Sequence, residues 1–225
     1  MLAHVVRVFV DGAGRHGNPL GIVLDAAGMG AEERQEAAGR LNFSETVFVE
    51  DAAAGRIRIH TPAAEVALAG HPLVGAAWFL ARRLGAEVRV LRPALAGPVD
   101  TWQEDGLTWV RARIDDAPDW RFVQLTAPAE VEALAVPPAP EYDLHEFWAW
   151  QDAAAGRLRA RVFASRYGIA EDEATGSGAL RLAALLGRPL TIAQGRGSLV
   201  YARPAAAAGF AEIGGRVAGD GERRV

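Results

Sequence analysis

Apolar and polar residues alternate at the start of the chain, where Val6, Val8 and Val10 are separated by single residues. This period of two predicts a strand. Residues 31–41 begin with glutamates, which suit the positive end of a helix dipole, so we expect a helix there. The pattern predicts further strands at residues 46–50, 56–60 and 210–213, and a frayed end at residues 219–225.

A glycine-rich segment follows the first strand. Residues 12–17 read G-A-G-R-H-G, which matches the G-x-G-x-x-G pattern of dinucleotide sites. Such a site requires a helix to begin at these glycines. Asn18-Pro19 leads instead into the apolar, β-rich run at residues 20–24. We therefore predict a glycine-rich hairpin and no dinucleotide site.

An internal repeat dominates the rest of the chain. Residues 55–85 and 156–187 share one plan, which is a Gly-Arg strand, a loop, a turn of small residues, an Ala/Leu-rich helix and a closing glycine. The repeat predicts two related α/β halves, each with strands wrapped around one buried helix. Prolines cluster between residues 126 and 140, so we predict an N-terminal domain at residues 1–127 and a C-terminal domain at residues 128–225.

The composition excludes several kinds of binding surface and catalytic site. Of 225 residues, 50% are hydrophobic and 23% charged, with a formal net charge of −4. This is typical of a soluble globular protein and predicts no nucleic-acid or membrane surface. The chain has no cysteine, and all 24 of its basic residues are arginine. Thiol catalysis, disulfides, a lysine Schiff base and a P-loop are therefore excluded.

Metal and membrane sites are not expected either. The five histidines are scattered without metal-ligand spacing. No apolar run approaches about 18 residues, and the first residues lack the basic start of a signal peptide. We expect a cytoplasmic protein that holds no metal.

Each copy of the repeat supplies a helix start preceded by small residues, Gly70-His71-Pro72 in the first and Thr175-Gly176-Ser177-Gly178 in the second. Free N–H groups and the helix dipole make such ends good sites for anions. If the halves face each other, both ends converge on one cleft that can hold a carboxylate. The alternative is that both are ordinary capped core helices.

Three ionisable residues stand close to these elements. Glu45 precedes an apolar strand, where partial desolvation would raise its pKa and suit it to acid–base catalysis. His71 opens a helix, where the dipole favours the neutral imidazole, and Asp172 precedes the second helix by one turn. The alternatives are a surface glutamate, a capping histidine and an acid that only matches the dipole.

Five groups of motifs follow one another along nearly the whole chain. They are Gly17-Asn18-Pro19-Leu20; Asn42-Phe43-Ser44-Glu45-Thr46; Thr61-Pro62-Ala63-Ala64-Glu65 with Gly70-His71-Pro72 and Gly75; Arg161-Val162-Phe163 with Glu171-Asp172 and Thr175-Gly176-Ser177; and Gln194-Gly195-Arg196 with Ser198. In order and spacing they resemble the PhzF family, the phenazine-biosynthesis isomerase-like proteins related in fold to diaminopimelate epimerase.

The resemblance implies a fold and an assembly. The fold is mixed α/β (α+β), with two pseudo-symmetric domains, each a barrel-like sheet around a central helix, and a site between them. Family members are usually homodimers. In the characterised isomerase, a glutamate moves a proton between carbons of a dihydro-hydroxyanthranilate without a cofactor. We therefore expect a small carboxylate-bearing metabolite as the partner, and no cofactor.

The family's functional residues fall on matching positions here. Its catalytic glutamate matches Glu45, and its histidine and aspartate match His71 and Asp172, which would orient the substrate and share the proton. Its T-G-S turn matches Gly176 and Ser177. We expect these last two residues, together with Asn18 and Gly70, to bind the substrate.

The chain departs from the family pattern at several positions. The interval between Ala133 and Arg157 is shorter than usual. Glu173 and Gly197 stand where proline is usual, and Gly178 stands at a usual small-residue position. Glu173 is expected to add a negative charge near the cleft.

The leading hypothesis is a cofactor-independent isomerase or epimerase-like enzyme. A serine hydrolase is the second, with Ser177 as nucleophile, His71 as base and Asp172 as orienting acid. Against it, Thr175 occupies the first glycine position of the G-x-S-x-G motif. The third hypothesis is a non-catalytic small-molecule-binding protein on the same scaffold.

Overall fold

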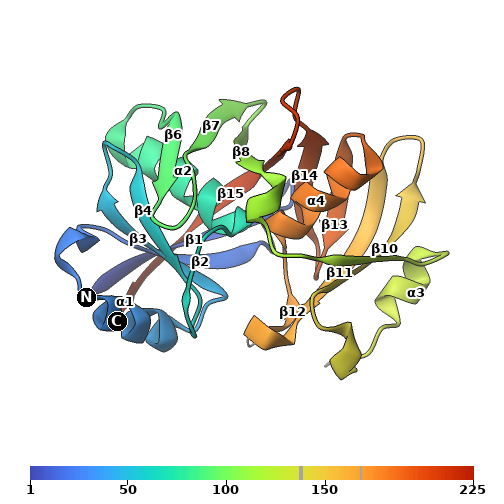
Figure 1. The fold of residues 1–225 in the computed structure, drawn as a ribbon, viewed down its shortest axis with the longest axis horizontal. Coiled ribbons are helices and arrows are strands. Elements are labelled where there is room, and N and C mark those ends of the chain that lie inside the picture. Colours follow the sequence, from blue (N-terminus) through green and yellow to red (C-terminus); the bar gives the residue numbers. More distant parts are fainter. Residues whose placement is uncertain (137–138, 168) are drawn as a thin grey trace.

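The computed structural model describes residues 1–136, 139–167 and 169–225, and it shows a mixed α/β fold with two similar halves side by side (Figure 1). Each half wraps strands around one buried helix, α2 (Gly70–Leu84) in the first and α4 (Gly176–Leu186) in the second. The predicted fold class is confirmed.

The first half contains the elements up to residue 113. They are β1 (Leu2–Val10), β2 (Asn18–Val23), η1 (Ala26–Gly28), α1 (Ala31–Leu41), β3 (Glu45–Asp51), β4 (Arg56–His60), β5 (Glu65–Val66), α2, β6 (Val90–Pro93), β7 (Val99–Glu104) and β8 (Leu107–Arg113). Helix α1 covers the predicted residues 31–41, and β3 and β4 cover the predicted strands.

The second half follows a short 3-10 turn. Its elements are η2 (Ile114–Asp116), β9 (Arg121–Gln124), α3 (Pro128–Glu132), η3 (Pro140–Tyr142), β10 (His145–Asp152), β11 (Arg157–Ala164), η4 (Ser165–Tyr167), β12 (Ile169–Asp172), α4, β13 (Leu190–Gln194), β14 (Ser198–Pro204) and β15 (Phe210–Arg224).

Both halves use one pattern of strand pairing. Strand β3 pairs in parallel with β2 and antiparallel with β4, and β10 does the same with β9 and β11. Strand β4 precedes α2 and pairs in parallel with β6, which follows that helix. In the same way β11 precedes α4 and pairs in parallel with β13, which follows it. The sequence repeat is therefore a repeat of structure.

Helix α2 is enclosed because apolar side chains cover most of its surface. Leu73, Val74 and Leu80 are fully buried. Gly85 ends the helix in the left-handed conformation (φ 65°), which glycine adopts without a Cβ clash, and Gly187 ends α4 in the same way (φ 63°). Within the described residues, no helix is long and apolar enough to cross a membrane.

Helix α2 begins at Gly70, and Pro72 is its third residue. Proline fits there, because the first four N–H groups of a helix have no partner within the helix.

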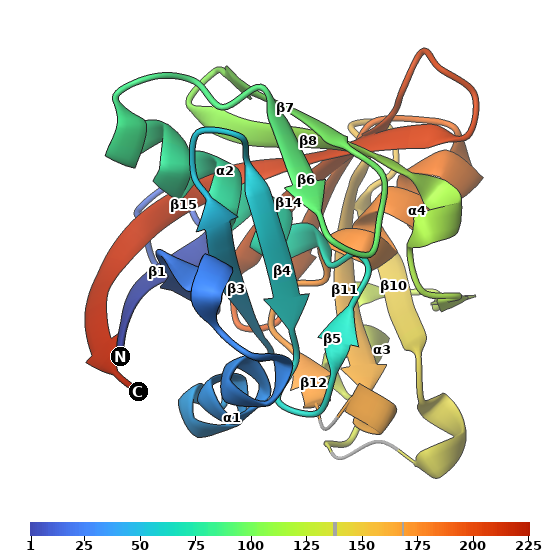
Figure 2. The same cartoon turned by 60° about the vertical axis from the view of Figure 1, so that its left-hand side comes forward.

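The C-terminal segment is not frayed, so the prediction for residues 219–225 is wrong. Strand β15 continues to Arg224 and pairs antiparallel with β1, with Leu2 opposite Arg224. The Val225 N–H donates to the carbonyl of Met1, so the two termini lie together (Figure 2). The partner strand, rather than local hydrophobicity, orders this glycine-rich end.

The glycine-rich segment at residues 12–17 forms a hairpin turn, as predicted. Strands β1 and β2 pair antiparallel on either side of it. The Asp11 carboxylate accepts the N–H groups of Ala13 and Arg15 and fixes the turn. No helix begins at these glycines, so the dinucleotide pattern is coincidental.

Candidate active site

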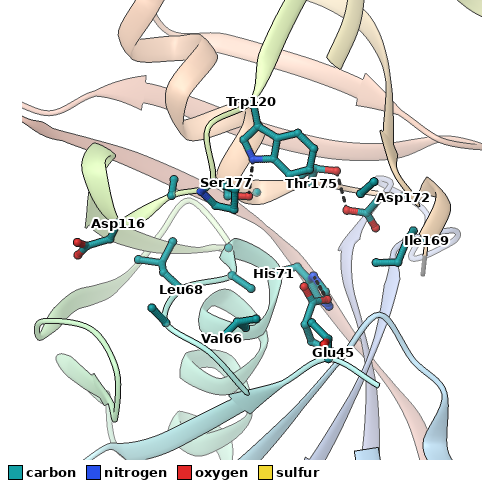
Figure 3. A pocket seen from close by; sticks show the side chains of 18 residues that line it. Glu45, Val66, Leu68, His71, Asp116, Trp120, Ile169, Asp172, Thr175 and Ser177 are labelled. Atoms are coloured by element: carbon teal, nitrogen blue, oxygen red, sulfur yellow. Dashed lines mark hydrogen bonds and ion pairs between the residues drawn. The ribbon is translucent and has the colours of Figure 1, made fainter. Parts of the chain in front are cut away.

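The first turns of α2 and α4 meet between the two halves. A Cβ atom on Gly70 would lie 2.6 Å from the Cα of Gly176, and one on Gly176 would lie 2.8 Å from the Cα of Gly70. Only residues without a side chain allow this approach. Beside the contact is a cavity of about 270 Å³, lined by residues of both halves (Figure 3).

Glu45 reaches this cavity from the first residue of β3. Its Oε2 lies 3.5 Å from Nδ1 of His71, and its side chain is 15% exposed. Within the described part of the chain, this buried oxygen has no hydrogen-bond partner. Burial, reinforced by the negative charge of Asp172, raises the pKa of Glu45 to about 8. Glu45 is therefore mostly protonated in the free protein at neutral pH.

His71, the second residue of α2, is 3% exposed. Burial lowers the pKa of its imidazole to about 3, so the ring is neutral at neutral pH. Its Nε2 has no hydrogen-bond partner among the described residues. A neutral imidazole beside Glu45 can donate or accept one hydrogen bond without adding charge to the cavity.

Asp172 closes the other side of the cavity at the end of β12. Burial raises its pKa to about 6, although the hydrogen bonds from Thr175 and Asn18 oppose this effect. The Oγ1 of Thr175 donates to Oδ2 at 2.6 Å, and the Nδ2 of Asn18 donates to Oδ1 at 2.7 Å. At neutral pH Asp172 is thus mostly ionised while Glu45 is mostly protonated.

Six of the seven predicted site residues line the cavity. They are Glu45, Gly70, His71, Asp172, Gly176 and Ser177. Asn18 does not line it, because its amide is engaged behind Asp172. Asn18 donates also to the carbonyl of Ala174 and accepts from the Ser44 hydroxyl.

The structure adds residues that sequence reasoning missed. The indole N–H of Trp120 donates to Oγ of Ser177 at 3.0 Å, on the side of the cavity away from Glu45 (Figure 3). Gln194 holds Thr175 through two contacts, accepting its N–H and donating to its hydroxyl. Gln194 and Thr175 lie in the quoted motifs, whereas Trp120 carries no local signal.

Glu173 stands next to Asp172 but does not line the cavity. Its carboxylate accepts the Ser198 hydroxyl and the Arg196 N–H instead. The reason is the turn at Gly195, whose missing side chain leaves room for this carboxylate. The charge of Glu173 still contributes to the raised pKa of Asp172.

The hydrolase triad is not assembled. Ser177 accepts from Trp120, His71 faces Glu45, and Asp172 is engaged by Thr175 and Asn18. Among the described residues, no hydrogen bond links any two of the three proposed triad members. The same part of the chain contains no cluster of three or more histidine or acidic side chains that could hold a metal ion.

The comparisons with known proteins agree with this geometry. The chain is 31% identical over 216 residues to the trans-2,3-dihydro-3-hydroxyanthranilate isomerase of Pseudomonas aeruginosa, covering 80% of this chain and 78% of that protein. It is also 31% identical over 235 residues to the isomerase of the same name from Pseudomonas chlororaphis, covering 83% and 84%.

Solved structures show the same fold. A putative phenazine biosynthesis PhzC/PhzF protein from Clostridium difficile superimposes with a TM-score of 0.77 at 18% identity, covering 100% of this chain and 99% of that one. A hydroxyproline epimerase from Agrobacterium vitis gives a TM-score of 0.61 at 14% identity, covering 99% and 91%.

Fold, cavity and relatives together define an enzyme of the isomerase class. The profile of the phenazine biosynthesis-like family PhzC-PhzF matches residues 6–135. The chain belongs to this family, which confirms the resemblance found in the sequence.

Proposed function

We propose that this enzyme is a cofactor-independent isomerase that moves a carbon-bound proton on a small carboxylate-bearing substrate, with Glu45 as the group that carries the proton. The observation that supports this most is the state of Glu45. Its buried Oε2 has no hydrogen-bond partner among the described residues, its pKa is about 8, and a neutral imidazole stands beside it.

A group that takes and then returns a proton works best when its pKa is close to the working pH. At pH 7 roughly a tenth of Glu45 is ionised if its pKa is about 8. The ionised form removes a proton from carbon, and the electron pair of the C–H bond moves into a neighbouring unsaturated system. The protonated form then delivers the proton to another carbon, so the double bond shifts without oxidation or reduction.

The charge that develops in this step needs stabilisation. Gly70, Gly176 and Ser177 line the cavity from the first turns of α2 and α4, where the helix dipoles favour an anion. We assign them the substrate carboxylate, into which the negative charge would spread. His71 would orient the substrate, and Asp172, held by Asn18, would take part in the proton transfer.

The substrate of the curated relatives, trans-2,3-dihydro-3-hydroxyanthranilate, is the first candidate. It carries the carboxylate and the unsaturated ring that the proposed step requires, and a cavity of about 270 Å³ suits a small ring. Following the family resemblance, we also propose a cytoplasmic homodimer, whose mass light scattering would establish.

Solvent deuterium incorporation tests the proposal. The wild type, Glu45→Gln and the matched control Glu33→Gln, which changes an exposed glutamate of α1, are offered the candidate and related cyclic carboxylates in D₂O. We expect deuterium at a carbon position with the wild type and the control, and an exchange rate about 10²–10⁴-fold lower with Glu45→Gln. Equal exchange by Glu45→Gln would refute the role of Glu45.

A further inference from the structure

A second glutamate occupies, in the second half, the position that Glu45 holds in the first. Glu146 stands 101 residues after Glu45, which is the spacing of the repeat. In the parallel strand pair of the first half Glu45 lies opposite Leu20, and in the corresponding pair of the second half Glu146 lies opposite Phe122. The fold thus places one glutamate in each half at equivalent points.

The surroundings of Glu146 differ from those of Glu45. Glu146 does not line the cavity and is only 1% exposed. Both of its carboxyl oxygens are buried, and neither has a hydrogen-bond partner in the described residues. A buried polar group without a partner is rare and calls for an explanation.

The carboxyl of Glu146 is directed at the first turn of α4. A Cβ atom on Gly178 would collide with Oε2 of Glu146, so the missing side chain of this glycine makes the room. The corresponding position of α2, the third residue of the helix, is Pro72. Gly176 and Ser177 of the same turn of α4 line the cavity. Glu146 therefore shares one helix end with the proposed carboxylate site.

Among the described residues, the charged groups on the elements around Glu146 are exposed or paired with other partners. On the two strands that flank it, Arg121 is exposed and Arg161 donates to Glu171. On α4, Arg181 donates to Asp119 and to two carbonyl groups. The remaining charged residues of β10, β11 and β12 are engaged elsewhere: His145 with the Asp143 carbonyl, Asp152 with Arg157, Arg159 with Glu132, and Asp172 with Asn18 and Thr175.

We propose that Glu146 is a positioning residue that must carry a proton for the α4 end of the cavity to bind a carboxylate. The inference rests on the proposed function, because it assigns a carboxylate to that end. A neutral Glu146 leaves the partial positive charge of the helix end available to the substrate, whereas an ionised Glu146 competes for it. Carboxylate binding and protonation of Glu146 are therefore coupled, and binding takes up a proton when Glu146 is ionised.

The pH range of this coupling follows from burial, which raises the pKa of Glu146 to about 8. Affinity for a carboxylate is expected to be constant below this value and to fall above it. Glu45 titrates in the same range, so a test must remove its contribution.

The test uses Glu45→Gln as the background and anthranilate as the probe, a small aromatic carboxylate of constant charge above neutral pH. Calorimetry measures its dissociation constant between pH 7 and about 9.5. In Glu45→Gln we expect affinity to weaken by up to about tenfold per pH unit above pH 8. In Glu45→Gln/Glu146→Gln the affinity should not change with pH. The control Glu45→Gln/Glu141→Gln, which alters an exposed residue, should behave like the background.

Buffers of different ionisation enthalpy add a second readout, because they report proton uptake on binding directly. Uptake is expected in the background and the control and should vanish without Glu146. If the double variant folds poorly, Glu146→Ala/Gly178→Ala in the same background replaces it. There the methyl group added at residue 178 enters the space that the Glu146 carboxyl occupied. This variant should also bind without pH dependence. Equal pH slopes and equal proton uptake with and without Glu146 overturn the inference.

The two proposals can fail separately. Linked binding together with an absence of deuterium exchange in the wild type would refute the proposed reaction and leave the inference intact. Deuterium exchange by the wild type together with pH-independent binding in the Glu45→Gln background would refute the inference and leave the proposed reaction intact. If anthranilate binds at no pH, both are contradicted, since both require a carboxylate site.

Discussion

The two halves share strands, register and a central helix, yet their helix ends carry different chemistry. In the first half Glu45 reaches the cavity and His71 stands beside it. In the second half the equivalent Glu146 is sealed behind the helix, and Asp172 from a neighbouring strand faces the cavity instead. We propose that the duplicated scaffold supplies two similar anion-binding helix ends but one proton carrier. The two halves would then bind the substrate in similar ways and differ in their acid–base roles.

The contact between the first turns of α2 and α4 is the feature whose disruption should have the largest effect. Gly70→Ala places a methyl group against the backbone of Gly176, and neither backbone can move without disturbing a core helix. We expect a loss of about 1–3 kcal/mol in unfolding free energy and loss of the exchange activity. Urea unfolding measures the first. Gly12→Ala, where the added methyl group meets nothing within 4 Å, should change neither.

Replacing Asp172 tests how the halves act on each other across the cavity. The negative charge of Asp172 helps to raise the pKa of Glu45. In Asp172→Asn the pKa of Glu45 should therefore fall, and the acidic limb of the profile of kcat/KM against pH should move to lower pH. We expect the maximum rate to fall by about tenfold or more, because the proton partner is gone. An unchanged limb would mean that the two carboxyls do not interact; Asp119→Asn, an exposed change, serves as the control.

Stability should fall with rising pH because of the two buried glutamates. Their folded-state pKa values are raised to about 8, above the ordinary value of 4.5, so the folded protein holds more protons than the unfolded one between these limits. The stabilisation is complete below about pH 4.5 and is lost up to about pH 8, with a slope of up to about 1.4 kcal/mol per pH unit for each group. Urea midpoints at pH 5, 6.5 and 8 should show a shallower decline for Glu146→Gln than for Glu141→Gln.

The smallest expected effect concerns the hydrogen bond between Trp120 and Ser177. Trp120→Phe keeps a ring but removes the N–H that donates to Ser177. One neutral hydrogen bond contributes about 0.5–1.5 kcal/mol, so we expect KM to rise by roughly two- to tenfold while kcat changes little. Steady-state kinetics would show this, with Trp102→Phe as the control. A selective loss of kcat would instead place Trp120 in the chemical step.

Much of this arrangement is visible in the sequence. The repeat predicted two halves with one enclosed helix each, and two halves that face each other predicted that the helix starts converge on one cleft. Glutamates at its start predicted α1, and the strand pattern predicted β3 and β4. These successes rest on local signals, since a helix start, a closing glycine and an apolar alternation are each encoded within a few residues. The division into domains at residues 127 and 128 stays a prediction, as do the catalytic roles.

Other features depend on contacts between distant residues. Residues 219–224 at the end of β15 give no strand pattern in the sequence, and pairing with β1 orders them. Trp120 becomes part of the site because η2 and the following loop bring it over Ser177. Glu173 is next to Asp172 in sequence but turns away to the residues around Gly195. The spacing of the repeat shows that Glu146 is equivalent to Glu45, but nothing in the sequence shows that Glu146 is buried.

The central claim is that equivalent glutamates in the two halves both carry protons at neutral pH, one open to the cavity and one enclosed. Carbon-13 NMR of protein labelled at the glutamate carboxyl tests this directly. The account predicts two resonances that titrate near pH 8, one lost in Glu45→Gln and the other in Glu146→Gln. If every glutamate titrates near its ordinary value of 4.5, neither residue is protonated at neutral pH, and the account is contradicted.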